Sequence, residues 1–162
     1  MKKLLIPSIF FVLLISFSFA QKPYKVVFYN LENFFDTIND PEVLDDEFTP
    51  DGPKKWNTAK YNKKLNNTER VLFDIAAIDK NYPIVIGVSE VETRGVLEDI
   101  VATPKLAPAN YRIAHFDSPE ARGVDVAFLY RPDVFKIEGQ YPVKTVIPSL
   151  PHFKTRDILT MW

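Results

Sequence analysis

Apolar residues in the first two-thirds of the chain follow a pattern that predicts strand, helix, strand and helix in turn. Residues 25–29 form a run of β-branched and aromatic side chains, typical of a strand, and residues 30–33 are expected to end it because they contain two asparagines. Side chains then recur at spacings of three and four over residues 61–79, as on one mainly apolar face of a helix, with Asn57 or Thr58 as the N-cap. Residues 81–83 are expected to end this helix.

The next two elements complete a β–α–β unit. Residues 84–88 form a continuous apolar run, typical of a strand covered on both faces, and residues 91–101 predict a short second helix that Pro104 ends. Residues 36–57, rich in proline and aspartate, indicate a long irregular connection of the kind that is usually functional or mobile. This order of elements predicts an α/β layered fold.

The last third of the chain changes to short strands separated by turns. Strands are expected at residues 111–116 and 124–130. Shorter strand candidates follow at residues 134–137 and 141–146, and one more begins at Arg156. The sequence contains no internal repeat.

The N-terminus has the composition of a targeting segment. Two lysines precede an apolar run over residues 4–19 that ends at Ala20, typical of a secretory signal peptide. The alternative is a membrane anchor, but the run has 16 residues and contains a proline, whereas a spanning helix needs about 20 apolar residues. We expect residues 1–20 to be a signal peptide cleaved after Ala20, residues 21–162 to be the exported domain (periplasmic or secreted), and no transmembrane segment to remain.

Composition narrows the chemistry. The chain has no cysteine, which excludes a disulfide framework, a thiolate metal site and a cysteine nucleophile. Only two histidines are present: His115, expected to be a satisfied core or edge residue of a strand, and His152, expected in a loop. A centre with several histidines is therefore excluded. Cleavage after Ala20 would leave 18 basic against 21 acidic residues, and a net charge of −3 argues against nucleic-acid binding by bulk charge.

Polar side chains follow both predicted strands of the β–α–β unit. Asn30 and Glu32 follow the first strand, and Glu90 follows the buried second strand. The carboxyl ends of strands are where ligands bind in α/β sheets, and oxygen ligands of this kind suit Mg²⁺, Mn²⁺ or Ca²⁺. The alternative is that Glu90 and Glu92 only solvate the end of a strand.

A third polar cluster lies in the turn over residues 117–125. Arg122 in this turn can present its guanidinium group to a phosphate, the pairing that arginine makes best. The alternative is an ordinary hairpin turn in which Arg122 pairs with Glu120 or Asp117.

Together these segments resemble the endonuclease/exonuclease/phosphatase superfamily, and in particular its secreted bacterial branch. This superfamily includes pancreatic-type deoxyribonucleases, apurinic endonucleases, sphingomyelinases and inositol phosphatases. Four segments carry the resemblance in the family's order: residues 26–33, 84–91, 117–130 and 155–159. Ser89 stands where the family's second motif usually has glutamine.

The resemblance implies a four-layer α/β/β/α sandwich and a phosphoester hydrolase, either a nuclease or phosphodiesterase or a phosphatase, with a divalent cation, usually Mg²⁺. Glu90 matches the metal-binding glutamate of the family, and Asn30 matches the asparagine that positions phosphate. Glu32 matches a position that is acidic and metal-linked in some branches. Arg122 matches a phosphate contact of the secreted branch. The substrate, whether nucleic acid, phospholipid or sugar phosphate, is left open.

Three motifs of the family are missing from residues 1–162: an Asn-His element, a Gly-Asp-x-Asn element and a terminal Ser-Asp-His. We therefore expect the N-terminal half of the sandwich in a truncated domain that is inactive alone, because acid–base work on a phosphodiester needs a base near the attacking water. Two alternatives remain open: an exported binding or structural module without chemistry, and one half of a split enzyme whose complementary chain carries the missing motifs.

Overall fold

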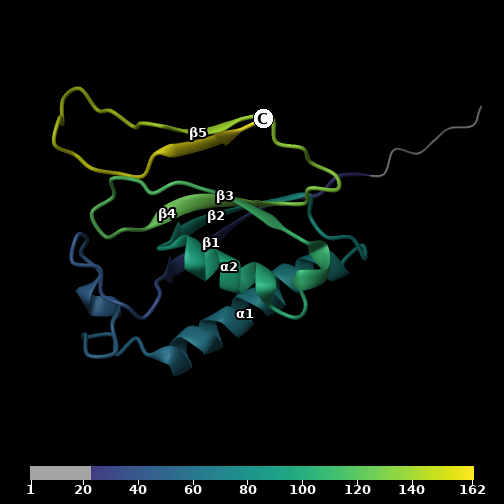
Figure 1. Ribbon diagram of the computed structural model, residues 1–162, viewed down its shortest axis with the longest axis horizontal. Coiled ribbons are helices and arrows are strands. Elements are labelled where there is room, and N and C mark those ends of the chain that lie inside the picture. The colour runs from purple at the N-terminus through teal and green to yellow at the C-terminus, as the bar shows by residue number, and fades with distance from the viewer. Residues whose placement is uncertain (1–22) are drawn as a thin grey trace, which may run out of the picture.

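A mixed four-stranded sheet forms the centre of the computed structural model, which describes residues 23–162 (Figure 1). The predicted signal peptide lies outside the described residues. The strand order is β1-β2-β4-β3, with β1 and β2 parallel and β4 antiparallel to both of its neighbours. The strands are β1 (Val26–Phe34), β2 (Val85–Val91), β3 (Arg112–His115) and β4 (Asp125–Tyr130).

Two helices cover one face of this sheet (Figure 1). Helix α1 (Thr58–Ala77) begins after Asn57, whose side chain accepts a hydrogen bond from the Lys60 N–H, and this confirms the predicted cap. Helix α2 (Arg94–Ala102) begins three residues later than predicted because Thr93 is its N-cap. Two 3₁₀ turns, η1 (Asp46–Phe48) and η2 (Ala107–Ala109), lie in the connections.

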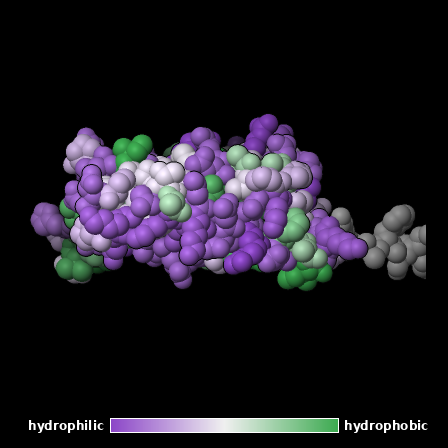
Figure 2. Space-filling model, turned by 90° about the horizontal axis from the view of Figure 1, so that it is seen from below, coloured by the Kyte–Doolittle hydropathy of each residue, from purple (hydrophilic) through white to green (hydrophobic). Residues whose placement is uncertain are grey.

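The core lies between the helices and the sheet. Along each strand, every second side chain points to the same face of the sheet. The side chains on the face toward the helices are apolar and buried. They include Ile86, Val88 and Leu129 from the sheet and Leu72, Leu97 and Ile100 from the helices. Residues 84–88 were predicted to be covered on both faces, and Val85 to Val88 are all buried. Seen from the helix side, the surface is largely hydrophilic (Figure 2).

The opposite face of the sheet carries a small second sheet. Strands β5 (Gln140–Val143) and β6 (Ile158–Met161) pair antiparallel and lie on the side away from the helices (Figure 1). On this face of β1, Val26 is 67% exposed and Phe28 is 69% exposed. Gly87 lies opposite Phe28, and a side chain there would collide with the Phe28 ring, since an added Cβ would lie 2.8 Å from it.

The structure confirms a mixed α/β fold, changes the bounds of two expected strands and removes a third. The complete four-layer sandwich stays a prediction. Strand β1 does not end at residues 30–33. Its pairing with β2 is interrupted after Asn30 and resumes at Phe34, because β2 is also irregular at this level, between Ser89 and Val91. Residues 134–137 are not a strand: a turn there returns the Phe135 N–H to the Arg131 carbonyl. The strand expected at 141–146 is shorter and runs from Gln140 to Val143. No helix among residues 23–162 is long and apolar enough to cross a membrane.

Candidate functional site

The topology brings the three predicted polar segments to one end of the central sheet. Strands β1 and β2 are parallel, so their carboxyl ends meet there. Strand β4 runs antiparallel to β2, and its first residue, Asp125, pairs with Val91 at the end of β2. Strand β3 ends at His115 at this same end. Residues from 30 to 125 thus contribute to a single edge of the sheet.

The central strands are irregular at this edge. Asn30 pairs with Ser89, and pairing resumes only at Phe34 and Val91. Between these pairs Glu32 and Asn33 have φ angles of 55° and 59°, and Glu90 has a φ of 61°. Side-chain-bearing residues adopt this left-handed conformation at a cost of about 1–2 kcal/mol each. The two strands therefore bulge at the same level, and the bulges carry the site residues.

Glu90 lies among hydrogen-bond donors and positive charges. Its Oε2 accepts a hydrogen bond from the Asn33 N–H at 3.1 Å, and its Oε1 lies 3.8 Å from a guanidinium nitrogen of Arg156. The Lys64 ammonium is close enough for the charges of Glu32 and Glu90 to raise its pKa, although burial, the larger effect, lowers the pKa overall. The Glu90 side chain is partly exposed, so a ligand can reach it.

Arg122 is joined to the same site. Its NH1 donates to Asn33 Oδ1 at 3.0 Å, while its Nε donates to Glu120 at 2.9 Å. The alternative interpretation, a turn in which Arg122 pairs with Glu120, is therefore confirmed, and the contact with Asn33 is additional to it. Burial raises the pKa of Glu120, but the hydrogen bonds and charge of Arg122 outweigh it, so that pKa is lowered. Asn33 bridges Arg122 and Glu90, one through its side chain and the other through its backbone.

Asn30 and Glu32 occupy the rim of the site. The Asn30 Oδ1 accepts the Glu32 N–H at 2.7 Å and so stabilises the local turn. Glu32 is exposed, and its backbone carbonyl accepts a hydrogen bond from Lys64. Among the described residues no hydrogen bond joins the Glu32 or Asn30 side chain to Glu90. The structure thus brings Glu90 and Arg122 together through Asn33 and leaves Asn30 and Glu32 at the rim.

The sequence analysis assigned no role to three residues of this site. Asn33 lies inside the first motif, and Arg156 lies inside the segment that matches the family's last strand of this region. An arginine preceding a strand was the available signal for Arg156. Lys64 lies on the polar side of the α1 pattern and carried no separate signal.

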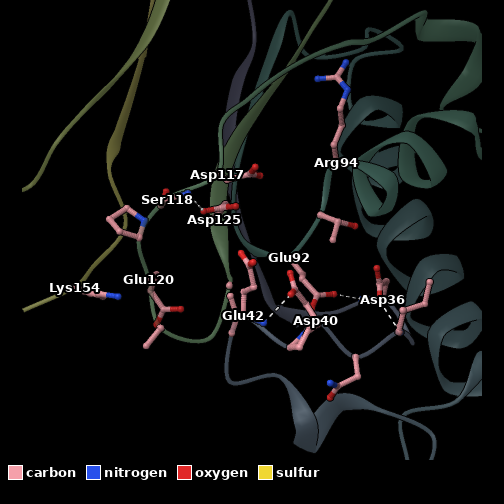
Figure 3. A pocket seen from close by; sticks show the side chains of 18 residues that line it. Asp36, Asp40, Glu42, Glu92, Arg94, Asp117, Ser118, Glu120, Asp125 and Lys154 are labelled. Atoms are coloured by element: carbon pink, nitrogen blue, oxygen red, sulfur yellow. Dashed lines mark hydrogen bonds between the residues drawn. The ribbon is translucent and has the colours of Figure 1, made fainter.

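A second group of carboxylates lines an adjacent cleft of about 670 Å³. Figure 3 shows its labelled acidic side chains, which are Asp36, Asp40, Glu42, Glu92, Asp117, Glu120 and Asp125. Glu92 Oε2 accepts the Asp36 N–H at 2.6 Å. The pKa of Glu92 is raised to about 8, chiefly by burial; the Asp36 N–H lowers it, while the charges of Asp36 and Asp45 add to the rise. Burial also raises the pKa of Asp36.

Glu90 offers the carboxylate oxygens that a hard divalent cation takes as ligands. Its Oε1 accepts no hydrogen bond within residues 23–162, and Glu32 and Asn30 supply further oxygens at the rim. Mg²⁺ is typically held by one or two carboxylates and completes its shell with water and substrate phosphate. The residues present therefore fit such an ion. Among the described residues, one group of three metal-ligating side chains comes together, and it does not include Glu90: His115, Asp117 and Asp125.

Comparison with known proteins gave one match. A family model described as the Endonuclease/Exonuclease/phosphatase family matches residues 25–162. No curated protein and no solved structure matches the chain. The matched region contains every element described above, including both strand bulges and the turn that carries Arg122.

Proposed function

The chain belongs to the endonuclease/exonuclease/phosphatase family, which points to a phosphoester hydrolase, and from this premise we propose that its Glu90 site binds a divalent cation and the phosphate of a phosphoester. The observation that carries the proposal is the bridge at Asn33. This residue fixes the Glu90 carboxylate through its N–H and orients the Arg122 guanidinium through its side chain. A metal ligand and a phosphate-binding cation are thus held side by side.

The charges around Glu90 suit a phosphate as well as a metal. Arg122 and Arg156 reach the site from different segments, and Lys64 approaches from α1. These three cations stand among the carboxylates of Glu90, Glu32 and Glu120, so the side-chain charges balance. A divalent cation bound at Glu90 would make the environment net positive, which favours a phosphate dianion or diester. Arg122 can present its guanidinium to two phosphate oxygens, the geometry that arginine provides and lysine does not.

Glu90 would hold the cation, with Glu32 and Asn30 as the neighbouring oxygen donors. A cation bound there supplies positive charge that stabilises negative charge on the phosphate oxygens. The chain's own residues have separate tasks: the Asn33 N–H holds the Glu90 carboxylate in place, and Arg122 and Arg156 orient the phosphate. Mg²⁺ is the expected ion, and Mn²⁺ or Ca²⁺ can occupy oxygen sites of this kind.

We propose the substrate at the level of a phosphoester. A nuclease or phosphodiesterase activity is favoured over a phosphatase activity only by the sequence resemblance. The net charge of the whole chain is −1, so it carries no excess of positive charge for duplex nucleic acid.

Metal binding by the full chain tests the proposal. We expect Mn²⁺ titrated into the chain by calorimetry to bind at one site that Glu90→Gln weakens by at least about tenfold, since even residues behind metal ligands change affinity by about 10–100-fold. Inorganic phosphate should bind more tightly when Mn²⁺ is present, and Arg122→Gln should remove that gain. Glu47→Gln is the matched control, because Glu47 is exposed and pairs only with Lys54.

Equal Mn²⁺ affinity in the wild-type and Glu90→Gln chains would contradict the proposal and favour a module without chemistry. Hydrolysis of bis(p-nitrophenyl) phosphate answers a separate question. The prediction is that the chain alone turns over no diester, because the motifs expected to activate the water are not in residues 1–162. Turnover that Glu90→Gln abolishes would overturn that prediction, and turnover restored by a chain carrying those motifs would support a split enzyme.

We also propose that the chain is exported. The support is the composition of residues 1–20. Expression in a bacterium with a secretion pathway, followed by mass spectrometry of the exported protein, should give an N-terminus at Gln21. A protein that keeps Met1 and stays in the cytoplasm would contradict this.

A further inference from the structure

A histidine and two aspartates converge at the acidic cleft, and no hydrogen bond or ion pair among the described residues joins any of them to Glu90. The side chains of His115, Asp117 and Asp125 each offer a ligand atom, and these atoms all lie within 4.8 Å of one another. His115 is the last residue of β3 and Asp125 is the first residue of β4, so both ends of the intervening turn contribute. Figure 3 shows Asp117 and Asp125 on the same part of the cleft wall.

The geometry of the pair at the centre suits a metal ion. The Nε2 of His115 lies 3.2 Å from Oδ2 of Asp125. Two ligands that are each about 2.0–2.1 Å from a tetrahedral ion are about 3.3 Å apart, so the same separation serves a hydrogen bond or two ligands of one ion. The Ser118 N–H donates to the other Asp125 oxygen at 2.8 Å and thereby orients Oδ2 toward the imidazole. Support of this kind behind a ligand is typical of metal sites.

Burial and charge at this position also favour a cation. The side chains of His115 and Asp125 are each only 3% exposed, whereas Asp117 is exposed and lies on the cleft. A cation would therefore enter from the cleft and meet Asp117 first. Two basic residues also line the cleft, Arg94 and Lys154, but Arg94 pairs with Glu98 at 3.0 Å. Carboxylates outnumber these two cations in the cleft lining.

We propose that His115, Asp117 and Asp125 bind a transition-metal cation of the Zn²⁺ class. Imidazole is a good ligand for Zn²⁺, whereas Mg²⁺ prefers oxygen donors alone, so the site differs in chemistry from that at Glu90. Three protein ligands leave a fourth position for water. The assignment does not depend on the proposed function, because it uses none of the residues that contact Glu90.

The position of the site suggests what the ion does. Asp117 and Asp125 stand at the two ends of the turn that carries Arg122, and Leu44 N–H donates to the Ala121 carbonyl within the same turn. A bound ion would join these two ends and reduce the conformational freedom of the turn. It would thereby hold Arg122 toward Asn33, so the ion is a positioning element and not a reactant.

The chain is well suited to a test, because it has two histidines and no cysteine. Zn²⁺ would be titrated into the full chain in competition with a chromophoric chelator, with Mg²⁺ in excess. We expect one Zn²⁺ per chain, and an affinity at least tenfold lower in His115→Gln and in Asp117→Asn. His152→Gln is the matched control and should bind as the wild type does. Glu90→Gln should also retain binding, which separates this site from the proposed function.

Two measurements distinguish the loss of a metal ligand from unfolding of the variant. His115 is buried and its variant can unfold, but Asp117 is exposed, so Asp117→Asn tests the ligand set in a folded chain. Zn²⁺ should also slow amide hydrogen exchange over residues 117–125 in the wild type and not in Asp117→Asn. The proposal is overturned if Zn²⁺ binds Asp117→Asn as tightly as the wild type, if His152→Gln or Glu90→Gln abolishes binding, or if no stoichiometric binding occurs.

Discussion

Glu90 and Glu92 lie two residues apart on one strand end, yet their surroundings are opposite. Glu90 faces the Asn33 N–H and the guanidinium of Arg156, with Lys64 nearby. Glu92 accepts only the Asp36 N–H and otherwise faces the carboxylates of Asp36 and Asp45. Glu90 therefore lies where donors and cations contact its carboxylate, whereas burial and neighbouring carboxylates raise the pKa of Glu92 to about 8.

The strand bulge produces this difference. In a regular strand, residues i and i+2 point to the same side. Glu90 has a φ of 61°, and pairing shifts between Ser89 and Val91, so the alternation is broken between the two glutamates. Val91 between them is fully buried. A single irregular residue thus directs one carboxylate toward cations and leaves the other in an acidic cleft.

The raised pKa of Glu92 also concerns its buried neighbour Asp45. Asp45 is 1% exposed, and its Oδ1 has no hydrogen-bond partner within residues 23–162. A hydrogen bond to Asp45 is among the causes that raise the pKa of Glu92. The carboxyl group of a protonated Glu92 is therefore a hydrogen-bond donor beside the buried Asp45 carboxylate.

Among the variants that test this comparison, Glu92→Gln has the largest expected effect on the free energy of unfolding. The native chain keeps the Glu92 proton up to about pH 8, while the unfolded chain loses it near the ordinary glutamate pKa. Between these values the unfolded state binds fewer protons, so this group makes the free energy of unfolding fall as pH rises. In metal-free buffer we expect Glu92→Gln to match the wild type at pH 5 and to exceed it by about 3 kcal/mol at pH 8.

Urea unfolding at the two pH values measures this effect. Glu90→Gln is the matched control variant, because it makes the same substitution two residues away, outside the acidic cleft. Parallel stability profiles for the wild type and Glu92→Gln would remove the distinction between the two glutamates.

A smaller effect on stability is expected from Asp45→Asn, which tests how much the Asp45 charge contributes to the raised pKa of Glu92. Asp45→Asn removes a buried charge that acts on Glu92. It keeps an oxygen to accept the Asp40 N–H, which in the native chain donates to Asp45 Oδ2 at 2.9 Å. We expect the loss of stability between pH 5 and pH 8 to shrink by about 1 kcal/mol. An unchanged loss in urea unfolding would show that the Asp45 charge contributes nothing to the raised pKa of Glu92 and would leave burial and the Asp36 charge as its causes.

The smallest expected effect on stability is at Arg156. Its guanidinium lies 3.8 Å from Glu90 without a hydrogen bond, and both side chains are partly exposed. Pairs of this kind contribute about 0–1 kcal/mol, so Arg156→Gln should unfold within about 0.5 kcal/mol of the wild type. Phosphate affinity, measured by calorimetry with Mn²⁺ present, should nevertheless fall severalfold. A large loss of stability with unchanged phosphate binding would make Arg156 a structural residue.

Much of the fold follows from local pattern. The spacing of apolar residues over 61–76 and the cap at Asn57 predicted α1, and the unbroken apolar run at 84–88 predicted the buried part of β2. The errors lie where local preference and pairing disagree. Residues 30–33 carry turn-forming asparagines, and the Asn30 side chain does form a local turn, yet pairing with β2 extends the strand to Phe34.

The candidate site divides in the same way. The sequence by itself determined which residue types stand at the ends of the strands, because strand and turn patterns are local and a carboxylate at the end of an apolar strand is visible in the chain. Only the tertiary structure decided their partners. Glu90 meets Asn33 across 57 residues and Arg122 meets Asn33 across 89. Such contacts depend on strand order, register and matched bulges, which arise from packing of the whole sheet and leave no local signal.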